Sequence, residues 1–272
     1  MISAFARIQP SVMITIPQAL IETVFLPGLL AATRVVGLFL SAPFFALQTI
    51  PGRFRVGLAL VVAFGIPLQI GALTTISINT STAGFMALAG IELLIGLAMG
   101  WVIRVGLVVF DLAAEVLSIQ TGLSFASNYN PDQALPSGVL GTLFGLVALA
   151  LMFSLNLHLV AIEILFDSFR SLPPGQWPKG LEVKGVASLL STCFGIGIIL
   201  ALPFVAINLV VMAAQGFMGR TSPQMNLFSI GFALSIPIGV FLVYILMPVF
   251  PEALQRSLEA AYGVIRMAFG SK

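Results

Sequence analysis

Long apolar stretches alternate with short polar ones along almost the whole chain. A helix that crosses the hydrocarbon core of a membrane needs roughly 20 apolar residues. Six stretches meet this length, at about residues 18–48, 56–74, 84–110, 138–165, 185–212 and 226–250. They are apolar on all sides, whereas the strands of a membrane barrel alternate apolar and polar residues. The pattern predicts an all-α, membrane-associated protein of about six long apolar helices arranged in hairpins.

Prolines and glycines interrupt these predicted helices. Each proline removes a backbone hydrogen-bond donor and favours a kink, and the prolines in or near the stretches are Pro17, Pro27, Pro43, Pro67, Pro203 and Pro237. Two pairs of glycines, Gly96 with Gly100 and Gly141 with Gly145, have the four-residue spacing that allows two helix backbones to approach closely. The same spacing also arises by chance in a glycine-rich chain. The helices are therefore predicted to be kinked and packed against protein.

Composition sharpens this prediction. Of the 272 residues, 59% are hydrophobic and only 8% are charged, and the mean hydropathy is +1.10. A soluble domain carries about 25% charged residues, so the surroundings of this chain must be lipid or other apolar protein. The net charge is only +2 and the 12 cations are scattered, which argues against a nucleic-acid partner. The single cysteine, Cys193, excludes an intrachain disulfide.

The distribution of cations predicts an orientation, because cytoplasmic loops carry an excess of Lys and Arg. With six helices both termini lie on one side, which collects Arg7, Arg170, Lys179, Lys184, Arg256, Arg266 and Lys272. The other side collects only Arg53, Arg55 and Arg220. The termini are therefore expected in the cytoplasm, and the polar segment 118–138 is expected on the outer side together with Arg53 and Arg55.

Ionisable residues within the apolar stretches are the first candidates for function, since each costs several kcal/mol unless it is paired or hydrated. Arg34 and Glu92 are a candidate pair between two helices. Arg104, Asp111 and Glu115 follow at spacings of seven and four, which places them on one helix face. Either the helix leaves the apolar layer near Asp111, or this face serves as a proton relay.

The single histidine and the lack of catalytic motifs argue against a metal site and against an enzyme. His158 has no cysteine or carboxylate at ligand spacing, and a metal site needs several ligands. It is interpreted as a polar residue satisfied by helix packing, with Asn156 as a candidate partner. No GxSxG, HExxH, P-loop or GxGxxG motif stands in a supporting context. We therefore expect no enzyme, no cofactor and no metal.

Residues 118–138, SIQTGLSFASNYNPDQALPSG, form the most unusual segment of the chain. It is polar and rich in turn-forming residues, although apolar stretches flank it on both sides. An ordinary connection between two helices needs only a few residues. The length and composition of the segment indicate a role beyond that of a connection.

Four stretches, in this order, resemble the FliR family, the flagellar branch of the type III secretion export-gate proteins and a relative of the injectisome SctT family. They are ATRVVGLFLSAPFFALQTIPGRFRVGLAL at 32–60, AEVLSIQTGLSFASNYNPDQ at 114–133, LNLHLVAIEILFDSFRSLPPG at 155–175 and SPQMNLFSIGFALSIPIG at 222–239. Two positions depart from the family pattern: Leu157 stands where the family usually has glycine, and Ala233 where it usually has proline. Neither departure affects the assignment to protein export.

The resemblance implies a structural pore subunit of the flagellar export gate, through which unfolded flagellar subunits cross the bacterial inner membrane. Such a subunit joins FliP and FliQ homologues in a helical assembly, with FlhB and FlhA homologues beside it. Residues 1–184 would be FliP-like and residues 185–272 a FliQ-like helical hairpin. The resemblance also implies that the complex lies largely above the membrane plane, within the ring of the flagellar basal body.

The resemblance also implies site residues. A loop that plugs the closed pore maps onto 118–135, with Gly122, Leu123, Ser124 and Phe125 at the constriction and a turn from Asn128 to Pro131. The polar residues expected at structural or interface positions are Arg34, Arg53, Arg55, Glu92, Arg104, His158, Pro223, Gln224 and Asn226. The alternative function is a six-helix secondary transporter that uses Arg34, Glu92 and Arg104, although the chain shows no internal repeat typical of such folds.

Overall fold

A computed structural model describes residues 25–43, 51–70, 81–124, 138–174, 176, 183–221 and 227–269. Within these ranges the chain is helical apart from short connections, and no strand occurs in them. The helices are α2 (Leu26–Ser41), α3 (Gly52–Ile70), α4 (Thr82–Thr121), α6 (Gly138–Ser154), α7 (Leu157–Ser171), α8 (Val183–Thr221), α9 (Leu227–Leu246), η2 (Met247–Val249) and α10 (Phe250–Phe269). The predicted all-α fold class is confirmed.

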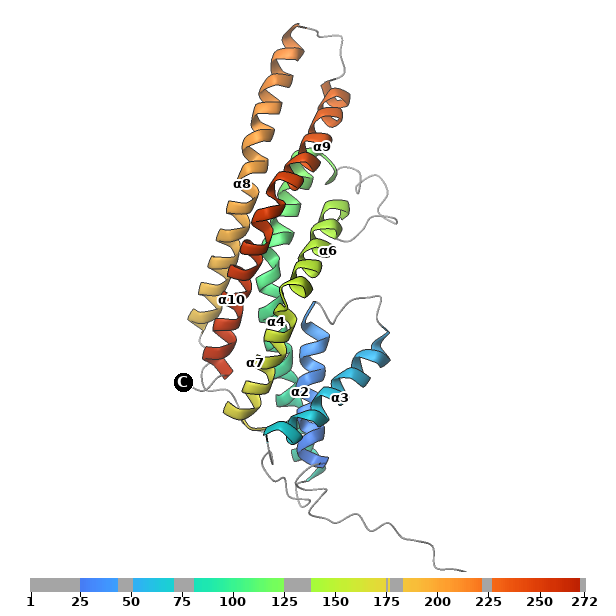
Figure 1. The fold of residues 1–272 in the computed structure, drawn as a ribbon, viewed down its shortest axis with the longest axis vertical. Helices are drawn as coiled ribbons and strands as arrows, with labels where there is room; N and C mark the ends of the chain where they lie inside the picture. Colours follow the sequence, from blue (N-terminus) through green and yellow to red (C-terminus); the bar gives the residue numbers. More distant parts are fainter. Residues whose placement is uncertain are drawn as a thin grey trace, which may run out of the picture.

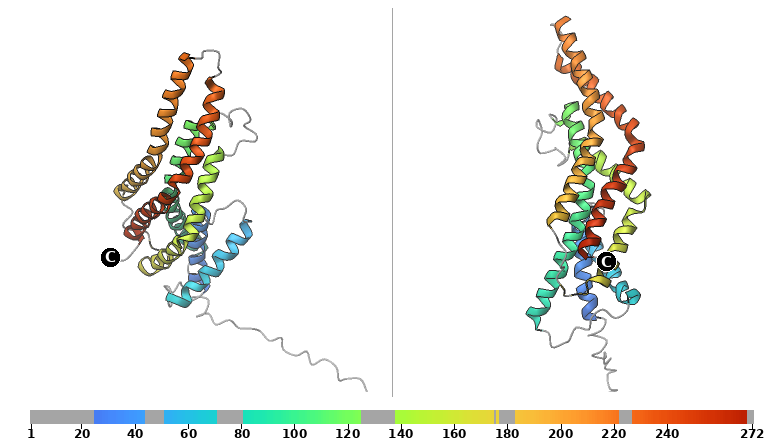
Figure 2. Two further views of the ribbon diagram at one scale, coloured as in Figure 1. Left: turned by 45° about the horizontal axis from the view of Figure 1, so that its top comes forward. Right: turned by 90° about the vertical axis from the view of Figure 1, so that its left-hand side faces the viewer.

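Helix α4 is the central element of the fold. It contacts α2, α6, α8, α9 and α10, while α3 packs on α2. Helix α8 and the run from α9 through η2 to α10 lie antiparallel as one long hairpin, whose tip projects beyond the end of α4 (Figures 1 and 2). The predicted hairpin arrangement of the C-terminal part is therefore present, and its predicted start at residue 185 falls within the first turn of α8.

The ends of α4 follow from its local sequence. The Ser81 hydroxyl accepts a hydrogen bond of 3.1 Å from the backbone N–H of Gly84, which satisfies one of the free donors at the helix start. The helix ends at Gly122, whose φ of 76° is a left-handed conformation that glycine adopts without a steric penalty. Between these residues α4 has 40 residues and is about 60 Å long.

Every predicted stretch contains a helix, but several boundaries were wrong. The stretches predicted at 84–110 and 185–212 continue as helix to Thr121 and Thr221. The stretch at 138–165 is not one helix, because α6 and α7 meet at a bend of 68°. Asn156 lies at this break with a φ of 56°, so a left-handed residue rather than a proline interrupts the span.

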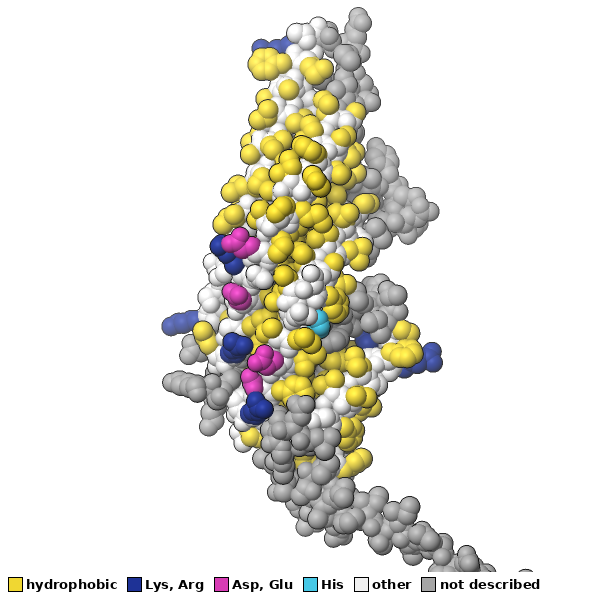
Figure 3. Space-filling view, in the orientation of Figure 1, with side chains coloured by type: hydrophobic (Ala, Val, Ile, Leu, Met, Phe, Trp, Pro, Cys, Tyr) yellow, Lys and Arg dark blue, Asp and Glu magenta, His cyan; other side chains and the backbone are white. Residues whose placement is uncertain are grey.

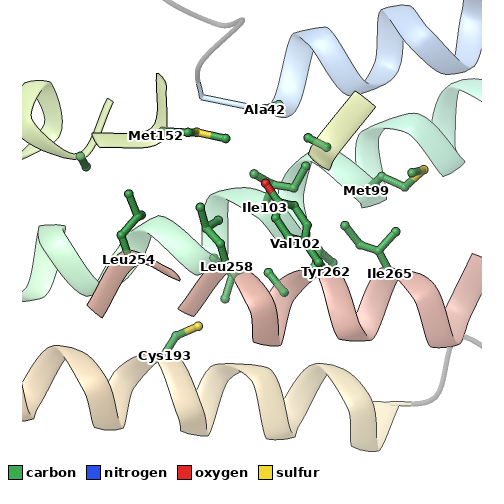
Figure 4. Packing of buried hydrophobic residues seen from close by; sticks show 14 of the residues in the cluster. Ala42, Met99, Val102, Ile103, Met152, Cys193, Leu254, Leu258, Tyr262 and Ile265 are labelled. Atoms are coloured by element: carbon green, nitrogen blue, oxygen red, sulfur yellow. The ribbon is translucent and has the colours of Figure 1, made fainter. Parts of the chain in front are cut away.

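Helix α10 was not predicted, because the last apolar stretch was ended at residue 250. Its apolar residues recur every three or four positions, so they form one buried face, while charged residues occupy the other. Figure 4 shows Leu254, Leu258, Tyr262 and Ile265 of α10 pointing toward α4. The helix is thus held by the packing of an amphipathic face rather than by overall hydropathy.

Three helical segments in the described ranges are long and apolar enough to cross a membrane. They are Thr82–Thr121, Lys184–Thr221 and Ala233–Phe269, and the bent pair α6–α7 is a fourth if it counts as one span. Helix α2, with 16 residues, is shorter. Each of the six predicted stretches thus contains a helix, but these helices are not six equivalent membrane spans.

Helices α2 and α4 approach each other across three glycines. A Cβ atom added to Gly96 would lie 2.0 Å from the carbonyl oxygen of Arg34, and one added to Gly100 would lie 2.8 Å from the carbonyl oxygen of Leu38. On the opposite helix, a Cβ on Gly37 would lie 2.5 Å from the carbonyl oxygen of Leu93. Real Cβ atoms do not approach backbone this closely, so the predicted role of the Gly96–Gly100 pair in close packing is confirmed.

The second predicted pair behaves differently. Gly141 is buried, but Gly145 is exposed, and a Cβ atom added there would meet nothing within 4 Å in the described part of the chain. Gly145 therefore makes no close approach to another helix in the described part of the chain.

The substitution Gly96→Ala is expected to destabilise the protein, because the added methyl group meets the backbone of α2 rather than a side chain that can move. Overpacking of a close contact costs about 1–3 kcal/mol. Gly90→Ala is the matched control on the same helix, since its Cβ would meet no described residue within 4 Å. Thermal unfolding in detergent should show a lower midpoint for Gly96→Ala alone, and equal midpoints for both variants would contradict the close approach.

Candidate functional site: a buried arginine and the end of α4

The candidate pair Arg34–Glu92 is present in the structure. The Arg34 Nε atom on α2 lies 2.6 Å from Glu92 Oε2 on α4, and both side chains are 0% exposed. The glycine contacts described above bring the two helices close enough for this bond. The pair therefore joins α2 and α4 inside the apolar core.

Arg34 also binds the C-terminal end of α7. Its Nη1 atom donates hydrogen bonds to the carbonyl oxygen and the hydroxyl of Ser168, at 3.1 and 3.2 Å, and Nη2 donates to the carbonyl oxygen of Leu172 at 3.1 Å. The guanidinium carbon lies 4.3 Å from the centre of the Phe169 ring. The last carbonyls of a helix lack donors within the helix and carry partial negative charge. One cation therefore satisfies both a carboxylate and a helix end.

This environment indicates a structural role for the pair. Removing one partner of a buried ion pair leaves an uncompensated charge, which costs about 3–5 kcal/mol. A group that moves protons or ions must be reached by them, whereas Arg34 and Glu92 are fully enclosed. Together they connect three helices, α2, α4 and α7.

Arg104 does not join this pair. It follows Glu92 by twelve residues, which places it about 120° around α4, and it is exposed. Asp111 and Glu115 are exposed on the same stripe of α4. The predicted shared face is thus present, but the three residues of the transporter hypothesis do not meet.

Arg53 and Arg55 lie in the first turn of α3, where Arg53 is exposed and Arg55 is half-buried. Cations are unfavourable at the N-terminal end of a helix because of its dipole. The two arginines therefore do not stabilise α3 itself, which is compatible with their expected role in contacts outside this helix.

His158 lies directly after the break between α6 and α7. Its ring packs against Phe153, with 4.8 Å between the ring centres. The Nδ1 atom is buried and receives no hydrogen bond from the described residues, so the expected satisfaction by Asn156 is not seen at this atom. The neighbouring carbonyl of Leu157 accepts a hydrogen bond of 2.8 Å from the Tyr262 hydroxyl, which ties the break to α10.

The proposed plug stretch begins inside α4. Residues 118–121 are helical, and Ser118 and Thr121 are buried, so the prediction that the loop starts at 118 was wrong. Gly122 ends the helix, and Leu123 and Ser124 follow it, half-buried. The residues predicted for the plug, Phe125, Asn128 and Pro131, and those predicted for interfaces, Pro223, Gln224 and Asn226, lie outside the described residues.

Several contacts were not predicted from the sequence. Arg34 donates to the backbone carbonyls of Ser168 and Leu172 as well as to the Ser168 hydroxyl, and backbone acceptors carry no sequence signal. Asn208 on α8 donates a hydrogen bond of 2.6 Å to Gln120 on α4. The signal for this contact was available, since an amide within the apolar stretch at 185–212 needs a partner.

Apolar side chains cover much of the surface. Figure 3 shows them over the upper part of the α8–α9 hairpin, while most of the charged side chains in this view lie lower on the molecule. Exposed fractions reach 72% for Phe217 on α8 and 72% for Tyr244 on α9, and Val61 on α3 is also 72% exposed. Monomeric soluble proteins rarely expose apolar area of this extent, so lipid or other protein covers these faces.

Substitution of one partner of the buried pair is expected to destabilise the protein strongly. Glu92→Gln leaves the Arg34 charge buried without its carboxylate, and a loss of about 3–5 kcal/mol is expected. The double variant Arg34→Met, Glu92→Leu removes both charges and should lose less than the two single variants, Arg34→Met and Glu92→Leu, together. Thermal unfolding in detergent measures each loss.

The exposed Arg104→Met is the control for this set and should change stability by no more than about 0.5 kcal/mol. A double variant whose loss equals the sum of the two single losses would contradict a direct pairing of Arg34 with Glu92.

Comparison with known proteins gives a consistent result. The profile of the family described as "Bacterial export proteins, family 1" matches residues 25–261. The flagellar biosynthetic protein FliR of Escherichia coli K12 is 32% identical over 219 residues, which are 79% of this chain and 82% of that protein.

Two further relatives carry the same name. FliR of Caulobacter vibrioides is 31% identical over 79% of this chain and 85% of its own length. FliR of Bacillus subtilis is 27% identical over 81% of this chain and 86% of its own length. The match spans the helices that hold the buried pair, the end of α4 and most of the C-terminal hairpin, and the chain belongs to the FliR family of bacterial export proteins.

Proposed function

We propose that this protein is a structural pore subunit of the flagellar type III export gate, through which unfolded flagellar subunits cross the bacterial inner membrane. Membership of the FliR family supports a component of the flagellar export apparatus. The observation that carries the finer proposal is the exposed apolar surface on α3, α8 and α9. Such a surface requires a large apolar environment, and neighbouring helical subunits provide one. The role is structural, without catalysis and without a cofactor.

The lengths of the helices support an assembly rather than a lone membrane protein. Helices α4 and α8 have 40 and 39 residues, about twice the roughly 20 residues needed to cross a hydrocarbon core. A helix of this length in lipid alone would extend far beyond the apolar layer. Packing against other subunits within the basal body, largely above the membrane plane, would cover its whole apolar length.

The proposed partners follow from the two parts of the chain. The first part, to about residue 184, is FliP-like in this proposal, and the hairpin of α8 to α10 is FliQ-like. Homologues of FliP and FliQ would pack on the exposed apolar faces, with homologues of FlhB and FlhA beside them. The exposed Arg53 and the charged stripe of Arg104, Asp111 and Glu115 are available for polar contacts in such an assembly.

The stretch that follows α4 is proposed to plug the closed pore. The left-handed Gly122 ends α4 sharply, so the chain leaves the helix directly at the start of the stretch, and the proposed plug is 122–135. Its composition suits a seal that moves aside, because small and polar residues bury little apolar area.

The secondary transporter is the weaker alternative. Its three charged residues do not meet at one place, since Arg34 and Glu92 are paired and enclosed whereas Arg104 is exposed. The charges of Arg34 and Glu92 are used for bonds between helices. A purified single chain that moves a small solute across liposome membranes would favour this alternative.

Removal of the plug should make the closed gate leak ions. Replacement of residues 123–135 by a short Gly–Ser linker keeps the helical end of α4 and removes the proposed seal. Cells that produce this variant are expected to take up or lose ions faster and still export some flagellar subunits. A Gly–Ser replacement of residues 177–182, between α7 and α8, is the control, and unchanged ion permeability in the plug variant would exclude the plug role.

The assembly itself is tested by co-purification. An affinity-tagged full-length chain extracted in mild detergent should bring FliP and FliQ homologues with it in a complex of constant composition. Charged substitutions on the exposed apolar face, such as Val61→Glu on α3 or Tyr244→Glu on α9, should reduce the recovery of partners. A stable monomer with no associated subunit would contradict the proposal.

A further inference from the structure

The last turn of α4 is clamped between the two helices of the C-terminal hairpin. On one side, Asn208 Nδ2 on α8 donates a hydrogen bond of 2.6 Å to Gln120 Oε1. Asn208 is only 7% exposed, so this amide lies in apolar surroundings. An unpaired buried amide costs free energy that a hydrogen bond recovers, and the bond therefore fixes α8 against the end of α4.

The hydrogen bond of Asn208 differs from those of two hydroxyl residues on the same helix. The hydroxyls of Ser188 and Thr192 on α8 donate to carbonyl oxygens of α8 itself, those of Gly185 and Ser188. Asn208 instead bonds to another helix, although asparagine is a poor residue for a helix interior. Neither helix propensity nor burial accounts for asparagine at this position, whereas the bond to Gln120 does.

On the other side, α9 meets the same turn through a glycine. A Cβ atom added to Gly239 would lie 2.6 Å from Cγ2 of Thr121 and 3.2 Å from Cδ1 of Leu117. The Thr121 hydroxyl donates a hydrogen bond of 2.8 Å to the carbonyl oxygen of Leu117. The methyl group of Thr121 is thus the atom that sets how closely α9 approaches.

We propose that Asn208 and Gly239 are positioning residues for the end of α4, and thereby for the start of the plug stretch at Gly122. This inference rests on the proposed plug function of residues 122–135. Two residues of the C-terminal half hold the turn from which the stretch leaves the helix, one by a hydrogen bond and one by the absence of a side chain. The C-terminal hairpin therefore determines where the plug stretch begins.

The first test measures the position of the turn directly. In a Cys193→Ser background, Ser124→Cys places a thiol just beyond the turn, and its rate of maleimide labelling is measured in the assembled complex. Asn208→Ala is expected to increase this rate at least several-fold. Thr82→Cys, at the exposed start of the same helix, is the reference thiol, and its rate should not change.

Two further variants separate positioning from general loosening. If Asn208 and Gln120 act through one bond, the double variant Gln120→Ala, Asn208→Ala should label no faster than either single variant. The exchange Gln120→Asn, Asn208→Gln keeps the summed length of the two side chains and should restore slow labelling. An equal increase in the labelling of Ser124→Cys and of Thr82→Cys would mean general loosening and would overturn the proposal.

A separate set of variants tests the contact between Gly239 and Thr121. Gly239→Ala should increase the labelling of Ser124→Cys, because its methyl group displaces Thr121. Adding Thr121→Ser removes Cγ2 and should return the rate toward that of the parent. Gly195→Ala on α8, where a Cβ would meet nothing within 4 Å in the described chain, should have no effect. Failure of Thr121→Ser to lower the rate would contradict this contact.

Ion permeability distinguishes the positioning role from the plug role. If both hold, Asn208→Ala and Gly239→Ala increase the ion leak of cells in the same order as they increase labelling. If replacement of 123–135 causes no leak while labelling responds as expected, the plug function fails and the positioning of the turn stands. If that replacement causes a leak while labelling is unchanged in both variants, the positioning proposal fails and the plug stands.

Discussion

The architecture depends on close contacts between α4 and the helices around it. Each of four neighbouring helices approaches α4 where a glycine replaces a side chain: α2 at Gly37, Gly96 and Gly100, α10 at Gly106, α8 at Gly197 and α9 at Gly239. In an apolar environment there is little hydrophobic force between helices, so association relies on close packing and on hydrogen bonds between them. Small residues provide the close packing, and they bring the helices near enough for hydrogen bonds to form between them.

The polar contacts in the core depend on this closeness. The bond of 2.6 Å between Arg34 and Glu92 crosses the interface at which Gly96 faces the backbone of Arg34. The bond between Asn208 and Gln120 joins α8 to α4, and these two helices approach each other at Gly197. Both lie among apolar side chains, where wrong pairings would leave polar groups unsatisfied. They therefore specify the register of the helices as well as holding them together.

Much of the remaining surface is suited to burial in an assembly. The upper part of the α8–α9 hairpin and the outer side of α3 expose large apolar residues, whereas the amphipathic α10 has its apolar face buried and its charged face outward. The chain thus completes a core around α4, but it leaves the outer side of α3 and the upper part of the α8–α9 hairpin uncovered. A structural subunit of a larger helical complex, as proposed, has this division between a closed core and open faces.

The fold class, the approximate place of each apolar helix and the pairing of Arg34 with Glu92 could be predicted from the sequence. Helix periodicity is local, and a buried charge in an apolar stretch needs an opposite partner. The break at Asn156, the helix after residue 250 and the helical state of residues 118–121 could not. Each depends on tertiary contacts that override local composition. Tyr262 bonds at the break, the core lies beneath α10, and the hairpin contacts Gln120.

By itself, the sequence determined an apolar all-α chain with ionisable residues that must be paired and glycines that allow close packing. Only the tertiary structure decided which glycines form contacts, since a Cβ on Gly96 would meet the α2 backbone and one on Gly145 would meet nothing among the described residues. The tertiary structure alone also decided that Arg34 binds the end of α7 and that Arg104 does not take part in the buried ion pair. The reason is physical: spacing along a helix sets which residues share a face, but the neighbour that this face meets is set by the rest of the chain.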